Sequence, residues 1–257
     1  MRPIDNEKPV VLTIAGIDPS GGAGIVADIK TIAAFECFPA AAITSITFQN
    51  APRVFGAEHQ SAATLRAQVE PIVQDATVAA AKTGMLPTAE IVAEVARLFR
   101  EEDLPAPVVD PVMVSTSGHD LIGEEAFQIL KVELLSVARL VTPNIPEAER
   151  LAGFSINTEA DMKRAAEAIR SLGARAVLVK GGHRKSATDI LLDEKGNFSE
   201  FHEEYIPVGE IHGSGCTLSA AIAASLGKEI SLAAAIGAAK KYLTDQIRLI
   251  RSSPSPS

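Results

Sequence analysis

The chain has 257 residues, of which 47% are hydrophobic, enough for one large α/β domain or two small ones. Its formal net charge is −8 and no basic run exceeds Lys240-Lys241, which disfavours nucleic acid or an anionic membrane as the main partner. The two cysteines, Cys37 and Cys216, lack CxxC spacing, so neither a disulfide framework nor a zinc site is expected. Without a signal-peptide pattern or a run of about 18 apolar residues, we expect a cytoplasmic protein.

Short apolar runs alternate along the chain with segments of helical periodicity. We predict strands over 10–15, 41–47, 79–83, 107–110, 140–142 and 176–179. We predict helices over 23–35, 63–75, 88–102, 124–138, 146–152, 159–172, 216–226 and 231–250. Nearly every strand residue is apolar, which is typical of strands that helices cover on both faces. The repeated strand-then-helix units predict an α/β fold with a doubly wound, mostly parallel sheet flanked by helices.

Segment 187–205 breaks this alternation. Its two strand-like runs, joined by a turn over 193–197, predict an antiparallel hairpin at an edge of the sheet. Because no linker, repeat or shift of composition divides the chain, we predict a single domain over 1–251. The serine- and proline-rich segment 252–257 predicts a disordered tail.

A glycine-rich loop precedes the predicted helix 216–226. Residues 212–217 read His-Gly-Ser-Gly-Cys-Thr and lead directly into apolar residues. Such a loop directs backbone N–H groups and the positive end of the helix dipole at one point, which suits a phosphate or a developing anion. In the first helical turn, Cys216 is expected to have a lowered pKa. A plain glycine turn, with Cys216 as a small buried side chain, explains the same residues equally well.

Polar or flexible residues follow each predicted strand, at the end where doubly wound sheets bind ligands. In chain order these are Gly16, Gln49 and Asn50, Lys82 and Met85, Asp110 and Met113, Asn144 and Glu147, Lys180 and His183, and the loop 213–216. Each has a structural alternative: the carboxylates can cap backbone groups, the methionines can fill the core and the lysines can be solvated. Because chance rarely places polar groups on consecutive ends of one rim, we predict a ligand site there.

Seven motifs run in a fixed order from about residue 10 to residue 242: AGIDPSGGAGIVADIKT, FQN, KTGML, DPVMVSTSG, TPNIPEAE, VKGGH and HGSGCTLSAAIA. This order resembles that of the hydroxymethylpyrimidine and phosphomethylpyrimidine kinases of thiamine biosynthesis, members of the ribokinase-like superfamily. The resemblance implies ATP-dependent phosphorylation of 4-amino-5-hydroxymethyl-2-methylpyrimidine, and then of its monophosphate to the diphosphate. It also implies ATP and Mg²⁺ as cofactors, and family analogy raises the option of a homodimer.

The resemblance also implies roles for the residues of the loop and of the metal site. Cys216 stands where many superfamily members place the catalytic aspartate of a GAGD-type loop. The anion hole would be formed with it by Gly213, Ser214 and Gly215. Asn144 and Glu147 resemble an NxxE element that organises magnesium and phosphate, and Asp110 would support the metal.

By the same resemblance, one group of residues binds the nucleotide and another lines the pyrimidine pocket. The nucleotide group is Lys180, Asn144 and Thr217. The pocket group is Gly16, Asp28, Gln49, Met85 and Met113. The chain departs from the common family pattern at Thr83, where isoleucine is usual, at Ser214, where threonine is usual, and at Glu210 and Ile211.

Gln49 favours one substrate class over its nearest alternative. A glutamine amide carries an acceptor and donors side by side, so it can pair with both the amino group and the ring nitrogen of an aminopyrimidine. The alternative is a pyridoxal or pyridoxine kinase of the same superfamily, some of which share a GTGC-type loop. A third hypothesis is a non-catalytic pyrimidine-binding regulator, which would be expected to lose the base or the anion loop; Cys216, Gly213 and Gly215 are present.

Overall fold

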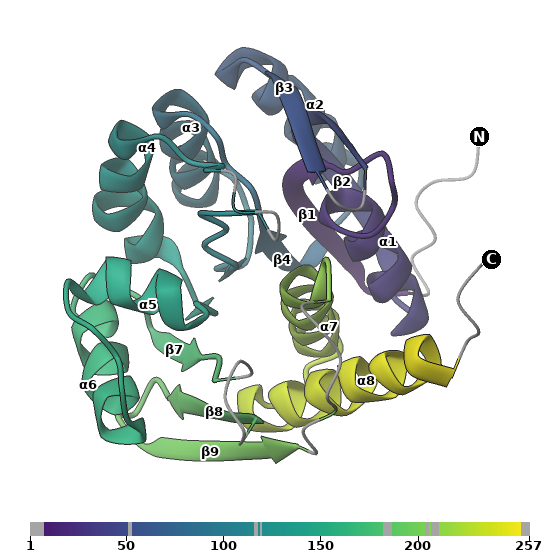
Figure 1. Cartoon of the computed structure of the whole chain (residues 1–257). Coiled ribbons are helices and arrows are strands. Elements are labelled where there is room, and N and C mark those ends of the chain that lie inside the picture. Colours follow the sequence, from purple (N-terminus) through teal and green to yellow (C-terminus); the bar gives the residue numbers. More distant parts are fainter. Residues whose placement is uncertain are drawn as a thin grey trace.

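The computed structural model describes residues 8–50, 53–115, 118, 120–181, 187–203, 206 and 211–252. Its strands are β1 (Val10–Ile17), β2 (Phe38–Asn50), β3 (Arg53–His59), β4 (Val78–Thr83), β5 (Val108–Val109), β6 (Leu140–Val141), β7 (Ala176–Val179), β8 (Ala187–Leu192) and β9 (Phe198–Glu203). They form a nine-stranded sheet in the order β3-β2-β1-β4-β5-β6-β7-β8-β9 (Figure 1). The six strands from β2 to β7 in this order are parallel. At one edge β3 pairs antiparallel with β2, and at the other β8 pairs antiparallel with both β7 and the edge strand β9. The predicted fold class and the edge hairpin are confirmed.

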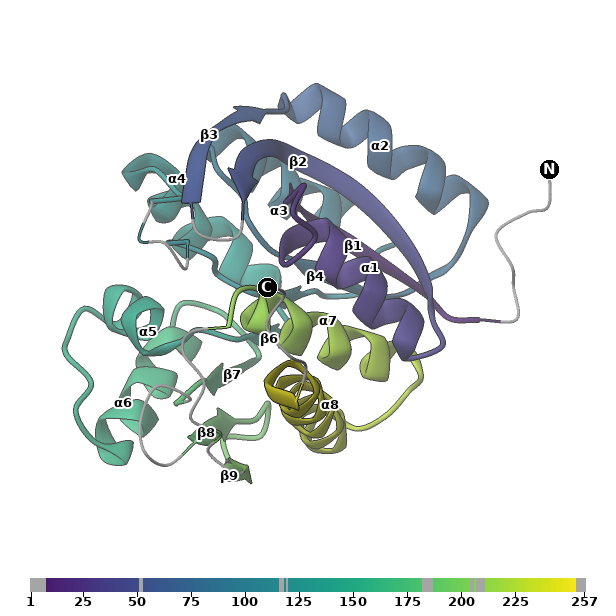
Figure 2. The same ribbon diagram turned by 45° about the vertical axis from the view of Figure 1, so that its right-hand side comes forward.

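Helices cover both faces of the sheet (Figures 1 and 2). One layer consists of α1 (Gly24–Ala34), α7 (Ser214–Gly227) and α8 (Leu232–Ser252). The other consists of α2 (Ala62–Asp75), α3 (Ala89–Glu101), α4 (Glu124–Ile129), α5 (Ile145–Ala152) and α6 (Glu159–Arg170). Successive residues of a strand point to opposite faces, so Val11 packs in the core under α7 and α8 while Leu12 packs in the other. This is why the strands are apolar throughout.

Some elements differ from their predicted bounds. The predicted helix 124–138 is α4 followed by a π-helical turn, η1 (Leu130–Leu134), and a 3₁₀ turn, η2 (Leu135–Val137). Strand β3 was not predicted, because its short segment carries little apolar alternation and forms by pairing with the extended end of β2. Helix α8 continues to Ser252, and the rest of the predicted tail lies outside the described residues, as do Glu210 and His183. Within the described ranges, no helix combines the length and the apolar character that crossing a membrane requires.

Thr83, at the end of β4, is fully buried, and its Oγ1 has no hydrogen-bond partner among the described residues. We expect Thr83→Val to raise the free energy of unfolding by about 1 kcal/mol, because valine keeps the shape and removes an unsatisfied hydroxyl. Urea unfolding measures this change. Thr44→Val is the matched control: Thr44 is equally buried but donates to the Met85 carbonyl at 2.7 Å, so its loss should destabilise the chain. A destabilised Thr83→Val protein would contradict the prediction.

Candidate active site

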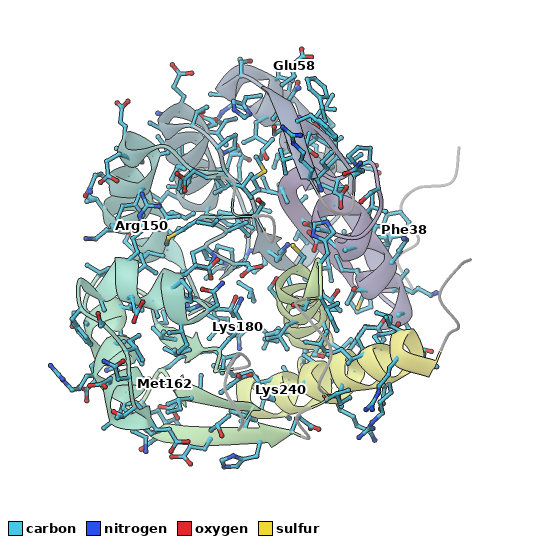
Figure 3. The ribbon with its side chains drawn as sticks, viewed as in Figure 1. Phe38, Glu58, Arg150, Met162, Lys180 and Lys240 are labelled. Atoms are coloured by element: carbon cyan, nitrogen blue, oxygen red, sulfur yellow. The ribbon has the colours of Figure 1, made fainter. Side chains whose placement is uncertain are left out.

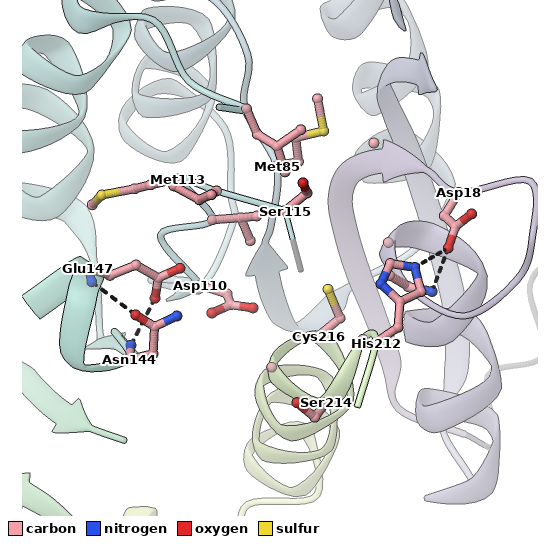
Figure 4. Close-up of a pocket in the computed structure, with 18 of the residues that line it drawn as sticks. Asp18, Met85, Asp110, Met113, Ser115, Asn144, Glu147, His212, Ser214 and Cys216 are labelled. Carbon is pink, nitrogen blue, oxygen red and sulfur yellow. Dashed lines mark hydrogen bonds and ion pairs between the residues drawn. The ribbon is translucent and has the colours of Figure 1, made fainter. Parts of the chain in front are cut away.

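The strand order reverses between β1 and β4, and the loops that leave these strands therefore diverge to opposite sides of the sheet. In open α/β sheets, ligands bind in the crevice at such a reversal, outside the carboxyl ends of the strands. A cavity of about 500 Å³ lies there (Figure 4). This volume falls within the range of small-molecule sites.

Of the residues that the resemblance gives a role, all but two line this cavity, whereas Asn50 and Lys82 of the predicted rim do not. Those that line it are Gly16, Gln49, Met85, Asp110, Met113, Asn144, Glu147, Lys180, Gly213, Ser214, Gly215 and Cys216. The two that do not are Asp28 and Thr217. The fold thus brings together residues that are spread over most of the sequence, and it separates two that the resemblance grouped with them.

The start of α7 offers fewer free backbone donors than the sequence suggested. The Ser214 amide donates to the carbonyl of Ile211 at 3.2 Å, and the Thr217 amide makes the first bond of the helix. The amides of Gly215 and Cys216 have no acceptor in the part of the chain that the structure describes. First-turn amides lack helical partners, so these two remain available to an anion. Ser214 therefore contributes to the cavity wall, whereas the Thr217 amide is used in the first hydrogen bond of α7.

The thiol of Cys216 projects from the first turn of α7 into the cavity (Figure 4). Loss of solvent raises its pKa to about 11, although the positive charge of Lys82 acts in the opposite direction. The carboxylates of Asp28 and Asp110 raise the pKa further. The predicted lowering of this pKa is therefore wrong, because desolvation and two nearby negative charges outweigh the field of the helix end.

Asp28 is fully buried behind the cavity rather than in its wall. Its carboxylate accepts hydrogen bonds from Lys82 Nζ at 2.8 and 2.7 Å and from Thr13 Oγ1 at 2.6 Å. The side chains of Lys82 and Asp28 are both completely shielded from solvent. The prediction that Asp28 contacts the substrate is therefore wrong. Asp28 lies on the face of α1 that packs against the sheet, where Lys82 of β4 neutralises its carboxylate.

A second ion pair lies at the wall of the cavity. Lys180 lies on the inner side of the fold (Figure 3), and its Nζ is 3.0 Å from Asp110 Oδ1. Both groups face the start of α7, because a Cβ added to Gly215 would lie 3.3 Å from Lys180 Nζ and 3.5 Å from Asp110 Oδ2. A side chain at this position would therefore crowd the ion pair, and glycine keeps the loop amides close to the lysine.

Asn144 and Glu147 form a capping box at the start of α5 (Figure 4). The backbone N–H of Asn144 donates to Glu147 Oε2 at 2.8 Å, and the backbone N–H of Glu147 donates to Asn144 Oδ1 at 2.9 Å. Burial raises the pKa of Glu147 to about 7, while the charge of Lys180 lowers it and that of Asp110 raises it. The structural and the functional interpretations of this pair are thus compatible, since the same two side chains cap the helix and line the cavity.

Three titratable lining residues were absent from the predicted site. Asp18 and His212 meet across the cavity rim, with Nε2 of the histidine 2.8 Å from Oδ2 of the aspartate. Arg150 stacks over the Phe127 ring at 4.3 Å and pairs with Glu124 at 3.0 Å. The Asp-Pro step after β1 and the histidine before the glycine loop were visible signals, whereas nothing local in the sequence marks Arg150.

This chain is similar in sequence and fold to several known proteins. The family profile described as phosphomethylpyrimidine kinase matches residues 18–255. A hydroxymethylpyrimidine/phosphomethylpyrimidine kinase of Rhizobium meliloti is 46% identical over 242 residues, which cover 91% of this chain and 88% of the relative. The crystal structure of a phosphomethylpyrimidine kinase from Clostridium difficile 630 is 39% identical with a TM-score of 0.83, covering 93% of this chain and 100% of that one.

A structure of Bacillus subtilis pyridoxal kinase in complex with ADP is 37% identical, with a TM-score of 0.84 and coverage of 92% and 91% of the two chains. The resemblance stated from the sequence is confirmed by these matches. Because the family profile spans nearly the whole chain and the relatives exceed one-third identity over nearly all of it, the chain belongs to the phosphomethylpyrimidine kinase family.

Proposed function

We propose that this chain transfers a phosphoryl group from ATP to 4-amino-5-hydroxymethyl-2-methylpyrimidine, and then to its monophosphate, in thiamine biosynthesis. One observation carries the proposal: a single cavity contains a glutamine amide, a thiol and, next to a lysine, two helix amides that have no acceptor among the described residues. The first group suits an aminopyrimidine, and the others suit a phosphoryl group in transfer. The relatives' names, which state both kinase activities, support the same conclusion.

The acceptor side of the cavity has room for a flat ring. A Cβ at Gly16 would lie 3.0 Å from Met85 Sδ, so glycine leaves the space beside this methionine open. Cys216, which lines the same cavity, would accept the proton of the substrate hydroxyl as it attacks. Its raised pKa makes the thiolate a strong base, and the buried positive charge of Lys82 favours that thiolate.

On the donor side, charge neutralisation is the main requirement of phosphoryl transfer. Lys180 and the amides of Gly215 and Cys216 would supply it to the phosphates of the nucleotide. Asp110 and Glu147 would hold Mg²⁺, which supplies further neutralisation when bound. The described residues contain no group of three or more candidate metal-binding side chains. This fits an ion such as Mg²⁺, which keeps several waters and binds through one or two carboxylates together with substrate phosphates.

The pyridoxal kinase alternative is supported by the similarity to the Bacillus subtilis enzyme. An assay of ADP release with Mg-ATP separates the two, with hydroxymethylpyrimidine, its monophosphate and pyridoxal as parallel substrates. Turnover of both pyrimidines well above pyridoxal is the expected result. A preference for pyridoxal would replace the proposal with the alternative, and no turnover of any substrate by folded protein would favour the non-catalytic regulator.

Gln49→Leu should weaken binding of the aminopyrimidine by about 10-fold or more, because up to two oriented hydrogen bonds are lost. The KM for ATP should stay level, since Gln49 lies on β2 at the acceptor side. Steady-state kinetics with each substrate varied in turn would measure both effects. Gln128→Leu, a change at an exposed glutamine of α4, is the matched control and should alter neither. An equal loss of affinity for both substrates would contradict the assignment.

A further inference from the structure

Hydrogen bonds hold the peptide units on both sides of Lys180. Its own backbone N–H donates to the Pro143 carbonyl at 2.8 Å, and Lys180 forms an isolated parallel bridge with Asn144. The backbone N–H of the next residue, Gly181, donates to Asp189 Oδ1 at 2.9 Å. Because peptide units are planar, fixing the units before and after Lys180 fixes its backbone, and with it the direction in which its side chain leaves the chain.

The acceptor for Gly181 is a side chain, because the backbone pairing of β7 with β8 ends two residues earlier, at Val179 and Ile190. Gly181 is buried, so its N–H needs an acceptor within the protein. The two segments are still close there, since a Cβ on Gly181 would lie 2.1 Å from the Thr188 carbonyl oxygen. The Asp189 carboxylate therefore continues the attachment of this segment to β8.

A buried lysine of α8 holds the Asp189 carboxylate in this position. Lys240 Nζ lies 2.8 Å from Asp189 Oδ2 and also donates to the Phe201 carbonyl at 3.1 Å (Figure 3). The two side chains are almost completely shielded from solvent. Each carboxylate oxygen thus has its own partner, the Gly181 amide for one and the lysine for the other.

This ion pair is separate from the cavity, because neither Asp189 nor Lys240 is among the residues that line it. Any effect of the pair on a bound ligand must therefore pass through the segment of Lys180 and Gly181. Apolar residues of similar size are often at least as stabilising as a buried ion pair. What the pair adds is direction, since an apolar side chain could not accept the Gly181 amide.

We propose that Asp189, held by Lys240, is a positioning residue for the nucleotide side of the site: it fixes the backbone of Lys180 so that Nζ meets the phosphates of ATP beside the amides of α7. The inference rests on the proposed function, which places Lys180 against those phosphates, and deepens it. Lys180 Nζ lies 3.0 Å from Asp110 Oδ1 and would lie 3.3 Å from a Cβ on Gly215. Because the lysine and the loop are so close, a small shift of the Lys180 backbone would separate Nζ from the loop amides.

Two double variants separate the hydrogen bond from the charges. Asp189→Asn with Lys240→Met removes both charges but keeps a side-chain oxygen that can accept the Gly181 amide. Asp189→Leu with Lys240→Met removes the same charges and the acceptor as well. We expect the first to keep the KM for Mg-ATP within about 3-fold of the wild type and the second to raise it by about 10-fold. The KM for the pyrimidine should stay level in both.

A further background makes the test specific. In Lys180→Met there is no ammonium group to position, so the two double variants should then have the same KM for ATP. Lys241→Met is the matched control, because Lys241 follows Lys240 on α8 but is exposed, and it should change neither KM. General damage to the fold would lower the active fraction, and so kcat, without separating the two KM values.

Two results overturn the inference alone. One is an equal KM for ATP in the two double variants, and the other is an undiminished difference between them in the Lys180→Met background. Calorimetric binding of Mg-AMP-PCP, without pyrimidine, keeps the inference separate from the proposed function. If the wild-type chain binds this ATP analogue but phosphorylates no pyrimidine, the proposed function fails, and a weaker Kd in the second double variant than in the first still supports the inference. If the wild-type chain does not bind the analogue, both are overturned.

Discussion

Replacing Cys216 by alanine is expected to lower kcat with Mg-ATP and hydroxymethylpyrimidine by about 10²–10⁴-fold, the usual contribution of a general base. The Cys216 side chain lies in the cavity wall beside the loop amides, where its thiolate would accept the proton of the attacking hydroxyl. Because it is partly exposed to the cavity, its removal deletes little packing, and the thermal unfolding midpoint should change little. Steady-state kinetics and thermal unfolding of the same preparation measure the two effects.

Cys37→Ala is the matched control for this result. Cys37 is buried under α7, where its Sγ lies 3.5 Å from the Ala224 carbonyl, so its loss should affect stability and leave kcat near the wild-type value. The pH dependence adds a second readout. A base must lose its proton to act, so kcat/KM of the wild type should rise from neutral pH toward the Cys216 pKa of about 11. A Cys216→Ala enzyme that keeps this rise, or most of its kcat, would remove Cys216 as the base.

Lys82→Met should destabilise the fold by about 3–5 kcal/mol, the usual cost of removing one partner of a buried ion pair. Among the described residues, the change leaves the Asp28 carboxylate with only the Thr13 hydroxyl as a side-chain partner, in a site fully shielded from water. Methionine fills most of the volume of the lysine chain, so the loss is electrostatic rather than a cavity effect. Urea unfolding of both proteins gives the difference directly.

The double variant Lys82→Met, Asp28→Leu should recover most of that stability, because it removes both charges and keeps the volume. Lys163→Met is the matched control: its exposed pair with Glu200, at 2.8 Å, should contribute little. If Lys82→Met unfolds at the same urea concentration as the wild type, or if the double variant is the less stable of the two, the buried pair does not have the assigned role.

Much of the fold was predictable because the local pattern and the long-range structure agree. Strand 176–179 and the start of the helix at Glu159 were predicted with the bounds that the structure has, because their hydrophobic periodicity is a local signal. Strand β3 was missed for the opposite reason. It pairs with the end of β2 outside the parallel core, and the local sequence of neither segment predicts that pairing.

The site was predictable as a rim but not in its fine arrangement. A strand order that reverses at β1 and β4 brings the strand ends together, so most of the polar residues chosen there do line the cavity. Whether a polar side chain faces the cavity or the core depends on distant partners. Asp28 points inward because Lys82, which is 54 positions away in the sequence, neutralises its charge there. A homodimer, a cytoplasmic location and the roles of the individual site residues stay predictions.

Helices α7 and α8 cover the part of one sheet face that α1 leaves open, and this has a consequence for synthesis. A chain that has left the ribosome only as far as β9 already contains every strand of the described sheet, but not yet α7 and α8. Except where α1 lies, Val11, Ala80 and Val108 then belong to an uncovered apolar surface. The nascent protein therefore passes through an aggregation-prone interval, in which a holding chaperone would have its target. Helix α7, whose packing begins to cover this surface, is also the helix that carries Cys216 into the cavity.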